Sequence, residues 1–275
     1  MVNVAILGFG TVGSGVAEVL TGHEGSIARK VEQSVALKYI LNRHDQPDSP
    51  FAPYFVKDFG VIEADPQVDI VVEAMGGVTA ALDMTRRALQ AGKHVVTSNK
   101  ELVAAHGYEL TQLAREQGVC YLFEGSVGGG IPIIRPLSQC LAANEILEIY
   151  GILNGTTNYI LTRMIRAGLS FAQALEEAQA QGYAERDPSA DIEGHDACRK
   201  ICILSAIAFG RHIYPHQVPT QGIDKVCLED VDYAAAAGKC IKLLGRAIRQ
   251  EDGRICAYVA PHLVDQSHPL AGVED

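Results

Sequence analysis

The sequence of 275 residues contains no tryptophan, and aromatic side chains make up only 6% of it. Positive charge is also scarce, because 23 Lys and Arg residues face 33 Asp and Glu residues and give a net charge of −10. This balance argues against nucleic acid as the main partner, although local amides and cations can still bind small anions. No apolar run reaches the length of a membrane-spanning helix, so we expect no membrane partner.

Paired cysteines and targeting signals are missing as well. The seven cysteines form no C-x-x-C pair, and their odd number is typical of free thiols in a reducing compartment. We expect most of them to be small buried apolar residues. A strand-like pattern begins at residue 2, so we also expect no signal peptide and a cytoplasmic protein.

The apolar run VNVAIL is followed by GFGTVG (residues 8–13) and then by the periodicity of a helix. A G-x-G-x-x-G motif alone is weak, but between a strand and a helix it predicts a dinucleotide site. Gly8 permits the tight turn, Gly10 lets the backbone approach a pyrophosphate, and Gly13 lets the helix pack close to the strand. The N-terminus of the helix then faces the phosphates.

Alternating strand and helix patterns follow this motif. Apolar runs predict strands at 35–42, 68–76, 94–99 and 119–127, with helices between them that end at Gly92 and Gly118. The sequence therefore predicts an α/β fold, a Rossmann-type doubly wound parallel sheet over 1–130. From 131 to 275 we expect an α+β domain for substrate binding, catalysis and dimerisation. Its predicted elements are helices starting near 155, at 169–182 and at 194–210, with Thr156 and Thr157 as N-cap candidates, and strands within 145–153 and 254–264.

The end of the second strand usually selects the cofactor, because an acid there binds the ribose 2′-hydroxyl of NAD. Here the strand ends in Asn42-Arg43, and the next acid is Asp45. Arg43 can bind a 2′-phosphate, so the sequence favours NADP over NAD, with Lys57 as a weaker candidate for this contact. A solvated surface charge at Arg43 is the alternative.

The predicted helix GHDACRKICILSAIAFG (194–210) is apolar but carries charges at its start. Asp196 and Lys200 are four residues apart and therefore lie on one face. As a simple ion pair they would contribute about 0.3–0.5 kcal/mol. The nucleotide motif favours a second interpretation, in which both line the edge of an apolar cleft.

A series of segments resembles the homoserine dehydrogenase family over essentially the whole chain: GFGTVGSGV, VVEAMGG, TSNKELVA, EGSVGGGIPII, NGTTNYIL, GYAERDPSADIEGHDACRK and HPLAGV. Arg186 departs from the family, which usually has proline at this position. The chain also stops just after HPLAGV, where family members continue. We therefore expect a C-terminally truncated chain with poor turnover.

The resemblance implies NAD(P)-dependent interconversion of L-homoserine and L-aspartate 4-semialdehyde in threonine, methionine and isoleucine biosynthesis. Lys200 would transfer the alcohol proton, with Lys100 facing the same oxygen, since an apolar site or a second cation can lower a lysine pKa. Glu185 and Asp196 would bind the substrate ammonium group. The helix rise separates Asp196 from Lys200 by about 6 Å, which matches the span from amine to hydroxyl in homoserine. Further substrate contacts are expected at Gly155, Thr156 and Tyr183.

The resemblance also implies cofactor contacts, a cation and a dimer. The expected cofactor contacts are Gly8, Gly10, Thr11, Val12, Gly13, Arg43, Met75, Gly76, Ser98, Lys100 and Gly182. A sodium ion is expected on the backbone oxygens of Glu124, Val127, Gly129 and Ile131, with an empty structural bend as the alternative. The strand at 254–264 can pair across a two-fold axis and form a homodimer.

Two other functions stay open from the sequence. A non-catalytic dinucleotide-binding sensor, or an inactive fragment, would bind NADP without consuming it when homoserine is added. A dehydrogenase that forms an acyl-enzyme would need a cysteine paired with a histidine. Cys198 and Cys202 flank Lys200, but no histidine has a clear pairing with either.

Overall fold

The computed structural model describes residues 1–44 and 46–274, which divide into two compact units over 1–134 and 135–275. Each unit has its own sheet and its own apolar core. Within the described residues, no helix has both the length and the apolar character needed to cross a membrane.

The first unit is a six-stranded parallel sheet in the order β3-β2-β1-β4-β5-β6. Its strands are β1 (Val2–Leu7), β2 (Val35–Leu41), β3 (Phe55–Val56), β4 (Ile70–Glu73), β5 (His94–Thr97) and β6 (Tyr121–Leu122). The direction of winding reverses at β1, which pairs with both β2 and β4. The predicted Rossmann-type sheet is thus confirmed.

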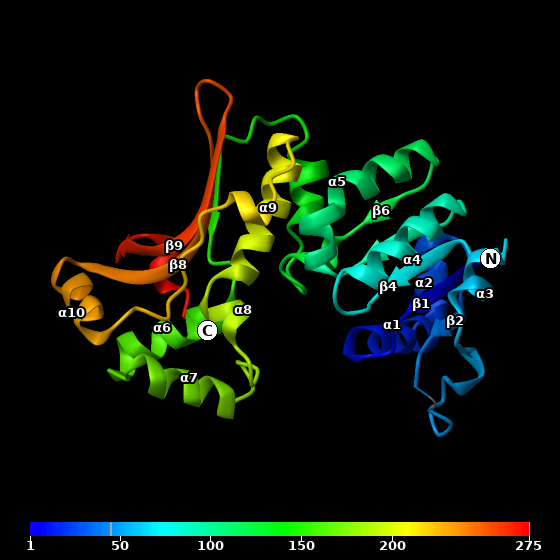
Figure 1. Cartoon of the computed structure of the whole chain (residues 1–275), viewed down its shortest axis with the longest axis horizontal. Coiled ribbons are helices and arrows are strands. Elements are labelled where there is room, and N and C mark those ends of the chain that lie inside the picture. Colours follow the sequence, from blue (N-terminus) through cyan, green and yellow to red (C-terminus); the bar gives the residue numbers. More distant parts are fainter. Residues whose placement is uncertain (45, 275) are drawn as a thin grey trace. The chain divides into compact units, whose positions relative to one another are not determined.

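Five helices connect these strands: α1 (Thr11–Gly22), α2 (Glu24–Val31), α3 (Phe59–Ala64), α4 (Thr79–Gln90) and α5 (Lys100–Glu116). Because crossovers between parallel strands are right-handed, reversal at β1 puts helices on both faces of the sheet. Figure 1 shows α1 on one side of β1 and β4, and α5 on the other. Ile6, Leu37 and Ile40 pack with Ala17 of α1 in one apolar cluster.

The predicted strand at 119–127 is shorter in the structure. After β6 the chain enters a 3₁₀ turn at Glu124–Ser126, and Gly128 and Gly129 have positive φ angles of 78° and 43°. The Glu124 carboxylate accepts the backbone amides of Ile133 and Ile134 at 2.8 and 3.0 Å. These contacts bend the chain back on itself and end the sheet.

The second unit has an antiparallel sheet in the order β7-β8-β9. Its strands are β7 (Glu148–Gly151), β8 (Lys239–Arg249) and β9 (Ile255–Asp265), and its helices are α6 (Gly155–Ala167), α7 (Phe171–Ala180), α8 (Ser189–Ile192), α9 (His195–Phe209) and α10 (Leu228–Ala236). Figure 1 shows β8 and β9 as one long hairpin. The mixture of helices with an antiparallel sheet confirms the α+β class. The sequence analysis missed β8, whose alternation is interrupted by Lys242, a lysine only 2% exposed.

Helix α9 packs closely on β8. A Cβ atom added to Gly245 would lie 2.6 Å from Leu153 Cδ1 and 3.3 Å from Ile201 Cβ, so glycine is what permits this approach. Leu153 is the residue just before the turn into α6. The same contact therefore fixes α9 and the start of α6 on one strand.

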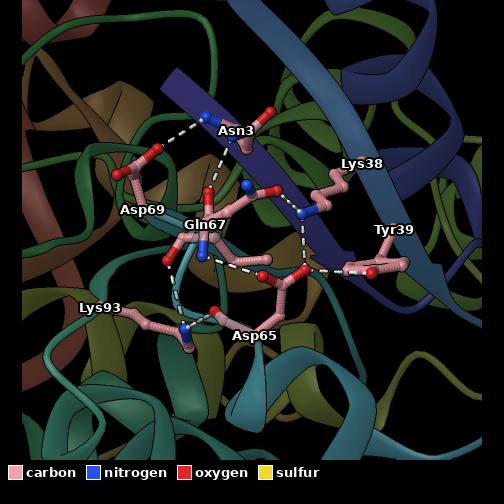
Figure 2. Close-up of polar contacts among 8 residues, drawn as sticks. Asn3, Lys38, Tyr39, Asp65, Gln67, Asp69 and Lys93 are labelled. Carbon is pink, nitrogen blue, oxygen red and sulfur yellow. Dashed lines mark hydrogen bonds and ion pairs between the residues drawn. The ribbon is translucent and has the colours of Figure 1, made fainter. Parts of the chain in front are cut away.

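A polar network holds the N-terminal edge of the first sheet (Figure 2). The Asp65 carboxylate accepts from Lys38 Nζ at 2.6 Å, from the Gln67 amide at 2.9 Å and from the Tyr39 hydroxyl at 3.0 Å. The Lys38 hydrogen bond, followed by that of Gln67, lowers the pKa of Asp65 to about 2. The ammonium group of Lys93 donates to the carbonyls of Asp65 and Val68, and burial lowers its pKa.

The expected burial of the cysteines is correct for only part of the set. Cys198 and Cys202 are buried in α9, whereas Cys120, Cys140, Cys227 and Cys256 are exposed. Cys120 precedes β6, Cys140 ends the π-helical segment Pro136–Cys140, Cys227 caps α10 and Cys256 lies on β9. All seven are free thiols, as expected.

Candidate active site

The glycine motif lies in the turn from β1 into α1. Gly8 has a φ of 95°, and an added Cβ would lie 2.9 Å from the carbonyl oxygen of Ala74. An added Cβ at Gly13 would lie 2.1 Å from the Gly8 carbonyl oxygen. Both positions therefore need glycine for the fold itself.

Gly10 is different, since it caps α1 with a φ of −89° that any residue can adopt. An added Cβ there meets no described atom within 4 Å. The backbone at Gly10 and the first residues of α1, Thr11 and Val12, thus border open space at a helix N-terminus. This arrangement fits a pyrophosphate, because such a terminus presents backbone amides to anions.

A pocket of about 240 Å³ opens beside this turn at the carboxyl ends of β1, β2 and β4. It is lined by Gly8, Leu41, Asn42, Arg43, His44, Met75, Gly76, Ala80 and Met84. The fold therefore brings the predicted cofactor residues Gly8, Arg43, Met75 and Gly76 together. Lys57 lies nearby, since its ammonium group donates to the Arg43 carbonyl at 3.0 Å.

Glu73, a buried carboxylate that was not predicted from the sequence, connects the carboxyl ends of β4 and β5. Glu73 is fully buried and accepts from the Met75 amide at 2.8 Å and from the Thr97 hydroxyl at 2.5 Å. Burial raises the pKa of Glu73. An acid inside the apolar run VDIVVEAMG was the available signal, because a buried carboxylate needs hydrogen-bond partners.

Asn99 connects the same region to Lys100. Its side chain caps α5 by accepting from the Leu102 amide at 3.1 Å, and it donates to the Gly77 carbonyl at 2.7 Å. Lys100 is the first residue of α5 and is half-buried. Ser98, two residues before Lys100, packs against the glycine-rich bend, since a Cβ added at Gly125 would lie 3.2 Å from Ser98 Cβ.

The predicted sodium residues occupy the bend after β6. Val127 is 3% exposed, whereas Ile131 is 71% exposed, and the Ile131 amide donates to the Gly128 carbonyl at 2.6 Å. The Gly129 φ of 43° and the Glu124 contacts described above shape the same bend. Among residues 1–44 and 46–274, no group of three or more His, Cys, Asp and Glu side chains could hold a metal ion.

In the second unit, Asp196 and Lys200 form an ion pair at the start of α9. Lys200 Nζ lies 2.7 Å from Asp196 Oδ2 and donates to the Leu153 carbonyl at 2.6 Å. The Lys200 and Asp196 side chains are only 17% and 4% exposed. Both side chains lie on one face of α9, as predicted, but their charged atoms are 2.7 Å apart and not separated by the roughly 6 Å that the helix rise gave for the substrate span. The pair is also much more enclosed than an ordinary surface ion pair.

The N-cap of α6 is Asn154, so the threonine N-cap prediction is wrong. Asn154 Oδ1 accepts from the Thr157 amide at 2.8 Å, which places Thr157 at the third helical position, where a capping bond is needed. Gly155 and Thr156 are then the first helical residues. Amides at these positions have no partner within the helix and are suited to an anionic ligand.

Asn154 also reaches two carboxylates. Its Nδ2 donates to Asp191 Oδ1 at 2.7 Å and to Asp196 Oδ2 at 2.9 Å. Asp191 belongs to the short helix α8. The sequence analysis assigned no site role to Asn154 or Asp191, because their contacts join segments almost 40 residues apart.

Tyr183 is also held at the start of α6. Its carbonyl accepts from the Thr156 hydroxyl at 2.8 Å, and its ring lies 4.7 Å from that of Tyr159, measured between centroids. Gly182, with a φ of 79°, ends the α7 region just before it. Glu185 follows on an exposed stretch, and its contact with a substrate stays a prediction.

Comparison with known proteins places both units in one family. A family model described as the NAD-binding domain of homoserine dehydrogenase matches residues 8–124, and one described as homoserine dehydrogenase matches residues 132–275. The homoserine dehydrogenase of Neisseria gonorrhoeae is 43% identical over 275 residues, which are 99% of this chain and 63% of the relative. The chain therefore spans less than two thirds of the length of that relative.

Solved structures agree with this assignment. A homoserine dehydrogenase from Thiobacillus denitrificans superposes with a TM-score of 0.93 at 42% identity, covering 99% of this chain and 64% of its own. A hyperthermophilic archaeal homoserine dehydrogenase, solved in complex with NADPH, has a TM-score of 0.78 at 28% identity, covering 98% and 84%. The chain belongs to the homoserine dehydrogenase family.

Proposed function

We propose that this chain provides the nicotinamide-binding and substrate-binding parts of a homoserine dehydrogenase. The reaction would interconvert L-homoserine and L-aspartate 4-semialdehyde in the biosynthesis of threonine, methionine and isoleucine. The observation that carries this proposal is the enclosed Asp196–Lys200 pair, with a distance of 2.7 Å, in a family of this activity. The free thiols are consistent with a cytoplasmic enzyme.

We assign each charged group of the substrate to a partner in the second unit. The Asp196 carboxylate would bind the ammonium group, with Glu185 as a second acid, since a desolvated cation needs carboxylate partners. The amides of Gly155 and Thr156 would bind the carboxylate at the N-terminus of α6. Tyr183, which is tied to Thr156, would line the pocket.

Proton transfer is the task we assign to Lys200. As a neutral amine its Nζ would accept the proton of the homoserine hydroxyl during oxidation, and as an ammonium it would return a proton to the forming alkoxide during reduction. Lys100, at the start of α5, would face the same oxygen. The nicotinamide supplies the hydride acceptor or donor when it is bound.

For the cofactor we propose NADP, with NAD as the alternative. Arg43 lines the pocket beside Gly8, where a ribose 2′-phosphate would lie, and the archaeal relative was solved with NADPH. The remaining contacts would come from Gly10, Thr11, Val12, Gly13, Met75, Gly76, Ser98, Lys100 and Gly182. A sodium ion on the backbone oxygens of Glu124, Val127, Gly129 and Ile131 completes the proposal.

We also propose a homodimer that forms through the antiparallel sheet. The middle of the β9 edge is already occupied, because Val259 donates to the Pro219 carbonyl at 3.0 Å and accepts from the Gln221 amide at 2.8 Å. Pairing along the whole of 254–264 would have to displace this segment. Tyr150 is exposed on the face of the sheet opposite to the core-facing residues Ile241 and Val259, which favours a contact through that face instead. Sedimentation tests this, and a monomer at all concentrations would contradict it.

Absorbance of the reduced nicotinamide tests the activity. The protein should reduce NADP when L-homoserine is added and oxidise NADPH when L-aspartate 4-semialdehyde is added. Homoserine lacking its amino group serves as the control and should not react, because Asp196 would have no cation to bind. Binding of NADPH without any turnover of homoserine would favour the non-catalytic sensor.

A further inference from the structure

Asn154 performs two tasks with one side chain. Its Oδ1 accepts from the amide and the hydroxyl of Thr157 at 2.8 and 3.0 Å, which caps α6. Its Nδ2 donates at 2.7 and 2.9 Å to the carboxylates of Asp191 and Asp196. The residue is only 6% exposed, so water does not replace these contacts easily.

The two contacts of Nδ2 join carboxylates from different helices. A primary amide has two donor hydrogens, and both are used here. Asp196 Oδ2 receives a second contact from Lys200 at 2.7 Å. Asp196 is buried and Asp191 is half-buried, so the two carboxylates would repel one another without donors between them. The amide of Asn154 is a neutral donor that separates them.

The charge of this cluster suits an amine. Asp191 and Asp196 each carry a negative charge and Lys200 a positive one, so the three groups together favour an added cation. A lysine in place of Asn154 would also bridge the acids, but it would cancel this preference. The neutral amide of Asn154 bonds to both Asp191 and Asp196 without cancelling their negative charge.

We infer that Asn154 is a positioning residue, which holds Asp191 and Asp196 in place and thereby fixes Lys200 and the binding of the substrate ammonium group. The residue itself does not take part in the chemistry. The inference rests on the proposed function, because it assigns the ammonium group to Asp196. It also connects the cap of α6, where the substrate carboxylate would bind, to the groups that bind the amine.

Two substitutions separate positioning from capping. Asn154→Ser keeps a hydroxyl oxygen that can cap α6 but removes both donors to the acids. Asn154→Asp keeps the shape and the cap but adds a third carboxylate. Ser170→Ala is the matched control, since Ser170 caps α7 in a capping box with Gln173 through an exposed hydrogen bond.

The first measurement is steady-state kinetics with L-homoserine. Asn154→Ser should raise KM about 10-fold to 100-fold, the usual effect of losing hydrogen bonds to charged groups, with little change in the affinity for NADP. For Asn154→Asp, the ratio of its KM to that of the wild type should fall as the pH is lowered, because a protonated carboxyl can again donate. Ser170→Ala should change only the melting temperature.

The second measurement does not depend on activity. Acetylation of Lys200, followed by mass spectrometry, should be several-fold faster in Asn154→Ser than in the wild type, because a loosened Asp196 no longer holds Nζ. Ser170→Ala should leave this rate unchanged. If the wild type does not turn over homoserine, the proposed function fails, and the labelling rate alone decides the role of Asn154. An unchanged KM in an active enzyme, or an unchanged labelling rate of Lys200, would overturn the inference.

Discussion

The glycine turn at residues 8–13 and the acid–lysine cluster of the second unit are suited to charged ligands for opposite reasons. The turn has no charged side chain, and it offers backbone amides that are accessible because side chains are missing. The cluster uses Asp191 and Asp196, which both accept from Asn154, and Lys200, which is paired with Asp196. The turn depends on room beside its backbone for a ligand, and the cluster depends on the pairing of opposite charges.

This difference determines how each site can fail. A larger side chain in the turn would collide with the backbone, as the 2.1 Å separation at Gly13 indicates, and would affect folding or cofactor binding. A neutral side chain in the cluster would leave another buried charge without its partner. We therefore expect steric defects in the first unit and electrostatic defects in the second.

The largest effect is expected in the cluster. Lys200→Met should lower kcat about 10²-fold to 10⁴-fold, because general acid–base catalysis usually contributes this much. The affinity for NADP, measured by fluorescence titration, should not change. Asp196→Ala and Glu185→Ala should instead act mainly on the KM for homoserine. A near-normal kcat with a reduced melting temperature in Lys200→Met would show that the pair is only structural.

Two glycine substitutions test the steric side of the comparison. Gly13→Ala should reduce the free energy of unfolding by about 1–3 kcal/mol or more, because the added methyl meets a backbone carbonyl that cannot move easily. Gly10→Ala should leave the melting temperature nearly unchanged, because its Cβ enters open space. It should weaken NADP binding about tenfold, because that space is the proposed position of the pyrophosphate. Thermal unfolding and cofactor titration of both variants check this. Equal destabilisation by the two would contradict the distinction.

The two sites were not equally predictable from the sequence. The turn is contiguous, so its strand, glycines and helix could be recognised together, and the class of the sheet, parallel and doubly wound, followed. The cluster depends on tertiary contacts between α6, α8 and α9. The pair Asp196–Lys200 was predicted because both lie on one helix, whereas Asn154 and Asp191 were missed.

Other differences have equally local causes. Thr156 and Thr157 are good N-cap residues by type, but Asn154 precedes them and competes for the same helix start. Strand β8 was missed because Lys242 and Gly245 interrupt its apolar run. Lys242 is nevertheless buried, since its ammonium group donates to Asn158 Oδ1 at 3.0 Å and to the Val273 carbonyl at 2.5 Å. Hydrogen bonds that offset the burial of a charge can be identified only once the positions of the bonded residues are known.

Arg43, at the edge of the cofactor pocket, tests whether cofactor binding in the first unit also depends on a charged side chain. Arg43→Ala should weaken NADP binding by about 1.5–3 kcal/mol, the contribution of one charge-assisted contact, and leave NAD binding nearly unchanged. Isothermal titration with both cofactors measures this. Lys57→Ala is the control and should have a smaller effect. Equal losses for the two cofactors would show that Arg43 does not recognise the 2′-phosphate.

The smallest effect is expected at Asp65, on the edge of the first sheet opposite the glycine turn. Asp65→Asn should reduce the free energy of unfolding by about 0.5–1 kcal/mol near neutral pH, because the lost ion pair with Lys38 lies near the surface. The folded-state pKa of about 2 lies below the ordinary value of 3.8. The carboxylate therefore stabilises the fold above pH 3.8, and this contribution is lost as the pH falls towards 2.

Urea unfolding at several pH values measures both parts of this prediction. The difference in stability between the wild type and Asp65→Asn should shrink as the pH falls from 4 to 2, while NADP affinity at neutral pH stays the same in both. The unchanged affinity matters most for the comparison of the two sites, because it separates charges that support the sheet from groups that bind ligand. A weaker affinity in Asp65→Asn would mean that the two edges of the sheet are coupled. The glycine turn would then depend on charge after all, through the strands that join it to Asp65.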